Sequence, residues 1–191
     1  VNFDKKWLNS RKKNNFLCFV GHGMICKGVD VVVEAFLKYP DSNLHICGPS
    51  EKSFMDYYQR LINKSKNITY HGFIDVGGDE FNKIAASCAY VINHSASESC
   101  CTAVATAMKA GLVPVINEWT SIPIKDNYNG IIIKDEGDII ENTIDKINLC
   151  VKISDNDYNT LLENNMNRVT NFSKIGFSKS YNDCIDFVIS A

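Results

Sequence analysis

The sequence lacks the patterns that define several large classes of protein. No apolar run approaches the roughly 20 residues that span a bilayer, and residues 1–15 are polar with no signal-peptide pattern. The eight cysteines contain no CxxC pair, and the four histidines are not at ligand spacing, so we expect no zinc or other metal site. A net charge of −2 argues against nucleic acid as a partner, because a nucleic-acid binder needs a basic face. These absences favour a cytoplasmic protein.

The common nucleotide-binding motifs are also missing. The chain has neither the GxxxxGK[ST] order of a P-loop nor the GxGxxG dinucleotide fingerprint, and it shows no internal repeat. What is present is ordinary for a globular core: 45% hydrophobic and 22% charged residues in 191 positions. That length suits one domain, or one half of a two-domain protein.

The cysteines do not form a disulfide scaffold. Five of them lie within apolar segments, where cysteine acts as a small buried hydrophobe: Cys18, Cys47, Cys88, Cys150 and Cys184. The other three, Cys26, Cys100 and Cys101, lie on predicted loops with no histidine nearby in sequence to activate a thiol. We therefore do not favour a catalytic cysteine, and the pattern fits a reducing compartment.

Apolar strands and amphipathic helices alternate along the chain. Strands are predicted at 16–20, 44–47, 68–73, 89–92, 112–116 and 131–133. A helix follows each of the first four, a turn joins the last two, and three more helices end the chain. The last helix has an apolar face formed by Phe177, Tyr181, Cys184, Ile185 and Val188. This alternation predicts an α/β protein, a Rossmann-like doubly wound parallel sheet with helices on both faces. Residues 1–15 are interpreted as a linker or arm, and 16–191 as the domain.

Ligands of such sheets bind beyond the carboxyl ends of the strands. That rule places residues 21–28, 48–50, 73–78 and 95–102 on one rim. In the first of these loops, Gly21-His22-Gly23 followed by Lys27-Gly28 suits a turn that holds phosphate, because glycines allow close backbone approach and a lysine at a helix start is unfavourable without an anion. A solvated lysine and an exposed histidine beside a flexible turn are the alternative.

A second polar loop follows the strand at 89–92 and leads into an alanine-rich helix. The unpaired amides of a helix N-terminus attract anions, yet Glu98 in this loop would repel phosphate. A carboxylate there is better suited to accept hydrogen bonds from hydroxyls, and the combination suggests a nucleotide sugar. Glu98 could instead be a helix cap, although Ser95, Ser97 and Ser99 compete for that role.

Four segments occur in an order typical of one enzyme family. They are Phe19-Val20-Gly21 with Lys27-Gly28-Val29-Asp30, then 67–73, then Ser97-Glu98 with 107–115, then Asn129-Gly130-Ile131-Ile132. The region resembles the C-terminal, donor-binding domain of GT-B glycosyltransferases, one half of a GT-B fold. The likeness is to the retaining enzymes that include many bacterial lipopolysaccharide, capsule and mannosyl transferases.

The resemblance implies roles for individual residues. Lys27 would bind the donor diphosphate and offset charge on the departing nucleotide, and Glu98 would contact hydroxyls of the donor sugar; these two are the expected catalytic residues. His22 stands where the family usually has an arginine. Phe73 and Ile74 would lie near the base. The complete set expected to bind donor is Gly21, His22, Gly23, Gly48, Phe73, Ile74, Ser99, Cys100, Cys101, Thr102 and Thr106, with backbone amides around 100–102 holding phosphate.

Besides His22, three positions depart from the family pattern. The family's second glutamate, which binds the ribose hydroxyls, falls at position 106, where this chain has Thr106. Threonine is shorter and uncharged, so a bidentate acceptor is lost. Hydrogen bonds to charged groups contribute about 1.5–3 kcal/mol, which corresponds to roughly 10- to over 100-fold in affinity. Ser99-Cys100 also replaces the usual Gly-Phe.

The leading hypothesis is the donor half of a retaining glycosyltransferase that uses a UDP- or GDP-linked sugar, without a cofactor or metal, in bacterial cell-surface polysaccharide synthesis. The acceptor, a glycan or lipid-linked glycan, would bind a separate N-terminal domain, and the full-length protein would act in the cytoplasm or at the inner face of the membrane, with peripheral membrane association. This chain alone would turn over no donor. The alternatives are a degenerate, non-catalytic binding module and, with less support, a sugar-nucleotide epimerase.

Overall fold

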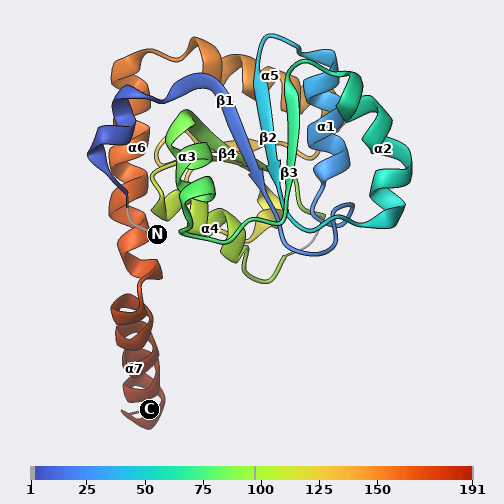
Figure 1. The fold of residues 1–191 in the computed structure, drawn as a ribbon. Helices are drawn as coiled ribbons and strands as arrows, with labels where there is room; N and C mark the ends of the chain where they lie inside the picture. Colours follow the sequence, from blue (N-terminus) through green and yellow to red (C-terminus); the bar gives the residue numbers. More distant parts are fainter. Residues whose placement is uncertain (1–2, 97, 191) are drawn as a thin grey trace.

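The computed structural model describes residues 3–96 and 98–190. Its centre is a 6-stranded parallel sheet with the order β3-β2-β1-β4-β5-β6 (Figure 1). The strands are β1 (Lys12–Phe19), β2 (Asn43–Cys47), β3 (Ile68–Gly72), β4 (Cys88–Asn93), β5 (Val113–Asn117) and β6 (Ile131–Ile133). The direction of winding reverses between β1 and β4, so the sheet is doubly wound, as predicted.

The first strand is longer than its apolar residues indicated. It begins at Lys12, ahead of the predicted start at Phe16, and its first three residues are exposed or half-buried. Polar side chains hold this part of the strand, since Asn43 Nδ2 donates to Asn15 Oδ1 at 2.9 Å and Lys13 Nζ donates to Ile153 O at 2.6 Å. The strand was predicted from a continuous run of apolar residues, which is typical of a parallel strand covered on both faces. Its polar first residues lie outside that run and were therefore missed.

Helices cover both faces of the sheet. On one side α1 (Val29–Lys38), α2 (Lys52–Lys64) and α5 (Ile139–Lys152) enclose an apolar cluster that includes Phe16 and Ile46. On the other side α3 (Asp79–Ser87) and α4 (Thr102–Lys109) enclose a second cluster with Leu17 and Val91. Helix α6 (Asp155–Val169) contributes to both clusters. Every residue of β4 is buried, as expected for a central parallel strand.

The last helix does not join this core. Helix α7 (Lys174–Ser190) extends away from the body of the molecule (Figure 1), and none of its residues is buried. Its apolar residues are exposed, and Cys184, predicted to be buried, is exposed as well. The periodic pattern correctly predicted a helix, but an apolar face does not say which surface covers it. Short 3-10 helices complete the chain at Lys5–Asn9, Glu118–Thr120 and Thr170–Phe172.

No helix within 3–96 and 98–190 is both long and apolar enough to cross a membrane.

Candidate functional site

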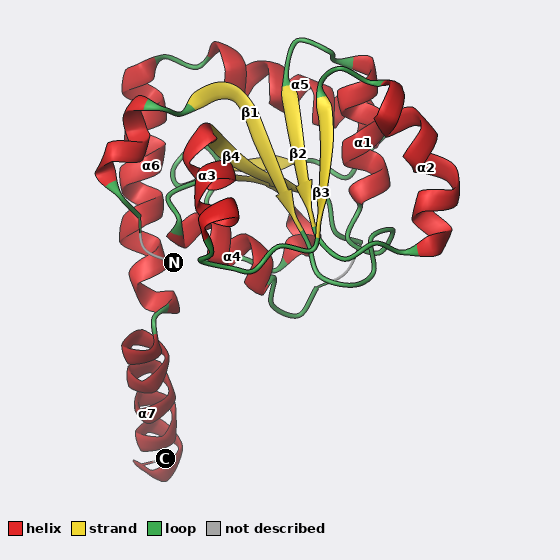
Figure 2. Ribbon diagram, viewed as in Figure 1, coloured by secondary structure: helices red, strands yellow, loops and turns green. Residues whose placement is uncertain are grey.

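The carboxyl ends of the strands point to one end of the molecule (Figure 2). The loops that follow β1, β2, β3 and β4 meet there, as the parallel order predicts. Three of these loops contribute to one cavity of about 310 Å³, which also takes in the start of α4. This end of the sheet therefore contains the candidate site.

The loop after β1 forms a tight turn before α1. Lys27 N donates to Gly23 O at 2.8 Å, and Gly28 N donates to Ile25 O at 2.9 Å. Gly28 has a φ of 65°, and a Cβ built on it would lie 1.8 Å from His94 O. Only glycine fits this contact, because a side chain would strain the backbone and overlap the end of β4.

The turn brings together the two residues predicted to be catalytic. Lys27 Nζ donates to Glu98 Oε1 across the gap between the loops that follow β1 and β4. The side chains are 23% and 10% exposed, so the pair is largely shielded from solvent. Two opposite charges in such a place stabilise each other more than an exposed pair does. The structure thus places these two residues in contact; their roles remain a proposal.

Glu98 also lies beside a cysteine at the start of α4. Cys101 is the N-cap residue, but no hydrogen bond from its side chain caps the helix. Burial raises the pKa of the Cys101 thiol to about 11, and the Glu98 carboxylate adds to this effect. A thiol in this state is protonated at neutral pH and is a poor nucleophile. Ser97, one of the cap candidates, lies outside the described residues.

The cavity contains many of the residues predicted to bind donor. Its walls include, among these, Gly21, His22, Gly48, Phe73, Ile74, Thr102 and Thr106. Phe73 is 73% exposed, and an aromatic ring open to solvent at a cavity mouth is a platform for a flat ligand. Of the other walls, Pro49 and Val76 fall within the predicted rim segments 48–50 and 73–78, whereas Phe19, Val20 and Ala103 were not predicted, because they carry no distinctive chemistry.

Six of the predicted site residues lie outside this cavity: the paired Lys27 and Glu98, and four of the set expected to bind donor. Gly23 lies in the turn before α1, and Cys101 is buried beneath the start of α4. Ser99 and Cys100 are exposed in the preceding loop, and Cys100 lines an adjoining hollow with Thr102, Thr106 and Phe177. The Thr102 amide, predicted to contact phosphate, donates to Cys100 O at 2.9 Å, so it must exchange that partner to bind an anion.

Thr106, which takes the place of the family's second glutamate, lines both the cavity and the hollow. Its hydroxyl donates to Thr102 O at 2.7 Å within α4. The hydroxyl hydrogen is therefore engaged, and only oxygen lone pairs face a ligand. The position offers one weak acceptor where a carboxylate would offer two strong ones.

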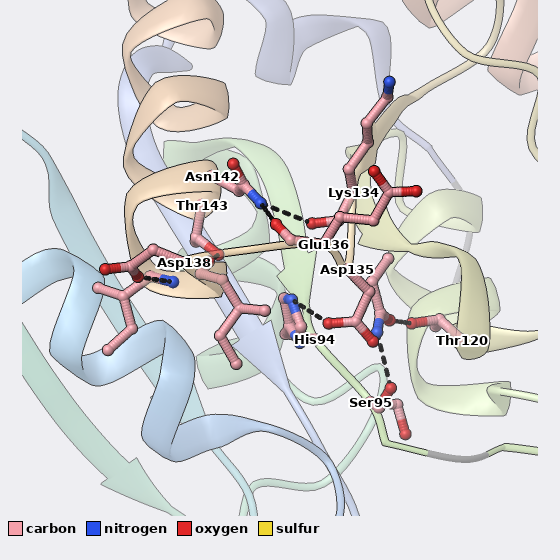
Figure 3. Close-up of polar contacts among 12 residues, drawn as sticks. His94, Ser95, Thr120, Lys134, Asp135, Glu136, Asp138, Asn142 and Thr143 are labelled. Atoms are coloured by element: carbon pink, nitrogen blue, oxygen red, sulfur yellow. Dashed lines mark hydrogen bonds and ion pairs between the residues drawn. The ribbon is translucent and has the colours of Figure 1, made fainter.

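A buried polar network supports the loop after β4. Asn117 Nδ2 donates to Ser95 O at 2.8 Å, and Thr120 Oγ1 donates to Asn117 Oδ1 at 2.6 Å. His94 Nε2 points to the Asp135 carboxylate at 3.8 Å (Figure 3). Burial lowers the pKa of His94, and Asp135 opposes that shift only in part. The imidazole is therefore neutral at pH 7, and the network is formed without a buried cation.

Two further histidines pair on neighbouring strands. His45 Nδ1 lies 3.0 Å from His71 Nε2. Burial lowers the pKa of both, and for His45 the neighbouring His71 lowers it further. Each is thus harder to protonate in the folded protein than in the unfolded chain. Among the described residues no group of three or more His, Cys, Asp or Glu side chains could hold a metal ion.

These three histidines predict how stability depends on pH. A pKa lowered by folding means that the unfolded chain binds more protons, so stability is complete above about pH 6.5 and declines as the pH falls below that value. We expect the melting temperature to decrease between pH 7.5 and 5.5, and the H45Q/H71Q double variant to lose part of this decrease. The variant His22→Gln serves as the control, because His22 is exposed in the loop after β1. An unchanged pH profile in the double variant would contradict the prediction.

Solved structures of known proteins share the fold described above. A search of curated proteins found no significant match. Three solved structures illustrate the similarity. A GtfA/B complex has a TM-score of 0.77 at 17% identity, covering 100% of this chain and 38% of that chain. The pneumococcal O-GlcNAc transferase GtfA, in complex with UDP and GlcNAc, has a TM-score of 0.72 at 16% identity and covers 100% and 38%. The C-terminal domain of the group 1 glycosyl transferase LpcC from Francisella tularensis has a TM-score of 0.69 at 20% identity and covers 88% and 91%.

The chain therefore spans about 38% of the length of the two GtfA structures' chains, and nearly the whole length of the isolated C-terminal domain. At these identities the likeness shows the fold, the Rossmann-like half of a GT-B glycosyltransferase, and confirms the predicted architecture. The family model for "glycosyl transferases group 1" matches residues 1–168. The chain belongs to the glycosyl transferases group 1 family.

Proposed function

We propose that this chain is the donor-binding half of a retaining glycosyltransferase, and that its ligand is a UDP- or GDP-linked sugar. The observation that carries the proposal is the Lys27–Glu98 pair at the carboxyl edge of the sheet, next to the cavity that contains Phe73 and Thr106. A cation and a carboxylate side by side suit a ligand that has both phosphates and hydroxyls. The UDP and GlcNAc bound to the pneumococcal relative support this class of ligand.

The proposed chemistry is electrostatic. Lys27 would move from Glu98 to the diphosphate and stabilise the negative charge that develops on the leaving nucleotide. Glu98, released from the lysine, would accept hydrogen bonds from the sugar hydroxyls. Amide groups at the start of α4 would hold phosphate oxygens, aided by the helix dipole. The nucleotide would leave on the face from which the acceptor approaches, so the configuration of the sugar is retained.

The rest of the reaction would need a second domain. We propose that residues 1–15 are an arm and 16–191 the donor-binding domain, although β1 already begins at Lys12. An N-terminal domain would bind the acceptor, a glycan or lipid-linked glycan of a bacterial cell-surface polysaccharide. The full-length enzyme would act in the cytoplasm or at the inner face of the membrane, associated with it peripherally. The chain by itself would bind donor without transferring the sugar.

One observation favours a second candidate, a non-catalytic binding module. The Thr106 hydroxyl donates within α4, so the ribose-binding carboxylate of the family has no substitute. A domain altered in this way could hold a nucleotide or a glycan without turnover.

Thermal-shift titration with UDP, GDP and their sugars tests the proposal. We expect a concentration-dependent rise in melting temperature with one of the two nucleotide series, because a ligand that binds only the folded state stabilises it. Absence of any shift with every nucleotide at millimolar concentration would contradict donor binding. A nucleotide could instead raise the melting temperature while no sugar is transferred after the N-terminal domain and an acceptor are added. That result would favour the non-catalytic module.

Thr106→Glu is expected to tighten UDP binding by about tenfold, because a carboxylate can accept two hydrogen bonds from the ribose hydroxyls. The gain should disappear with 2′-deoxy-UDP, which has lost one of the two hydroxyls. Thr160→Glu is a matched control, because Thr160 is exposed in α6 and also donates to the preceding helical turn, at 3.0 Å from Asn156 O. Isothermal titration calorimetry measures these affinities. An equal gain for both nucleotides would refute the ribose contact.

A further inference from the structure

We propose that Glu51 is a positioning residue that sets the location of Lys27 by holding the backbone turn before α1. The proposal rests on the diphosphate role of Lys27 given above. Glu51 follows β2 and is the N-cap residue of α2, yet its side chain makes no capping hydrogen bond to that helix. The carboxylate reaches instead to the loop after β1, far from it in sequence.

Both carboxylate oxygens of Glu51 accept hydrogen bonds there. Oε1 accepts from the Gly23 amide, and Oε2 accepts from the Met24 amide at 3.0 Å. Two amides that point the same way form a concave donor site, and here a carboxylate of the chain itself occupies it. The contact is bidentate, so it fixes both the position and the orientation of this part of the turn.

The same two residues determine the position of Lys27. Gly23 O accepts from the Lys27 amide at 2.8 Å, and Met24 O accepts from the Val29 amide at 3.0 Å. The Met24 side chain is fully buried, so this part of the turn cannot slide without losing core packing. Glu51 thus holds one side of the turn, and the backbone of Gly23 and Met24 transmits that position to Lys27 and the first turn of α1.

The opposite side of the turn is held by the loop after β4. Cys26 O accepts from the Ala96 amide at 2.9 Å. Lys27 therefore lies between two fixed points, and the first of these is held by the Glu51 carboxylate together with the buried Met24 side chain. Removal of the Glu51 carboxylate leaves the second anchor intact, so we expect Lys27 to be displaced while the domain still folds.

A double-mutant cycle tests this role. UDP affinity is measured by calorimetry, and for weak variants by ligand-observed NMR, in Glu51→Ala, Lys27→Ala and the double variant. We expect Glu51→Ala to weaken UDP about tenfold in the wild-type background and less than about twofold when Lys27 is already alanine, because coupled residues are not additive. Glu51→Gln, which keeps one acceptor oxygen, should restore part of the affinity.

The matched control is Asp56→Asn, since Asp56 lies in the same helix, where its carboxylate accepts from Lys52 at 2.6 Å and makes no contact with the turn. It should leave UDP affinity unchanged. An equal loss from Glu51→Ala in both backgrounds would show that Glu51 acts independently of Lys27 and would overturn the proposal. A gain of affinity would overturn it too, because Glu51 would then be competing with phosphate for the two amides.

Hydrogen exchange separates this inference from the proposed function. If wild-type protein binds no UDP, the donor-binding proposal fails, but Glu51 can still be tested without ligand. In Glu51→Ala we expect faster amide exchange at Gly23, Met24, Lys27 and Val29, and unchanged exchange in β4. Exchange rates in the turn equal to those of Asp56→Asn would overturn the positioning role.

Discussion

Replacing Lys27 with alanine is expected to weaken the binding of a nucleoside diphosphate by about 10- to 100-fold. Lys27 forms an ion pair with Glu98 at the carboxyl edge of the sheet. A charge-assisted hydrogen bond to phosphate contributes about 1.5–3 kcal/mol, and the low exposure of the pair limits screening by salt. Calorimetric titration with UDP and GDP measures the change.

The variant must be shown to fold before its affinity is interpreted. Without Lys27 the Glu98 carboxylate, only 10% exposed, loses its cation, so Lys27→Ala should also be less stable than wild type. Lys38→Ala is the control, because Lys38 forms an exposed pair with Glu141 at 3.0 Å and lies away from the cavity. A folded Lys27→Ala protein with wild-type affinity would disprove the diphosphate role.

Gly28→Ala is expected to produce the largest loss of stability in the turn. The added Cβ would lie 1.8 Å from His94 O and 2.6 Å from His94 C, distances that real contacts do not reach, so the end of β4 or the start of α1 must move. The φ of 65° adds the strain of a left-handed backbone. We expect a loss of about 3 kcal/mol or more and a fall in melting temperature of roughly 6–12 °C.

Gly137→Ala separates the two causes. Gly137 has a similar φ of 69°, but a Cβ there would meet nothing within 4 Å, so this variant reports backbone strain without overlap. We expect it to lose about 1–2 kcal/mol. Thermal unfolding followed by circular dichroism measures both variants. Equal losses for the two would mean that the contact between Gly28 and His94 contributes nothing.

Much of the fold could be predicted from the sequence because the burial of parallel strands leaves a local signature. The segments around Leu17 and Val91 are apolar on both faces, and each is followed by a helix with an amphipathic pattern. The strand order itself comes from the structure. Right-handed crossovers then decide which face each helix covers, and the carboxyl ends of the parallel strands bring their loops to one edge. The errors arise where this signature is absent, at the polar start of β1 and along the exposed α7.

The candidate site could be predicted only in part. Lys27, Glu98 and Thr106 were identified from motifs, and the structure brings them to the same end of the sheet. Glu51 was missed because nothing near it in sequence marks it. A glutamate before a helix is ordinary, and only its distance in space from Gly23 shows what it binds. The cavity walls formed by Phe19, Val20 and Ala103 were missed because apolar side chains carry no distinctive chemistry.

The sequence by itself determined the sheet, its helical layers, the family and the edge of the sheet at which the candidate site lies. These depend on patterns within each strand and helix and on the order of short motifs. Tertiary structure alone decided that Lys27 pairs with Glu98, 71 residues away, and that Glu51 holds the turn. The physical reason is that β1 lies between β2 and β4, so the loops that follow these strands meet in space. Which side chains pair within that meeting point depends on loop paths and rotamers that no local pattern encodes.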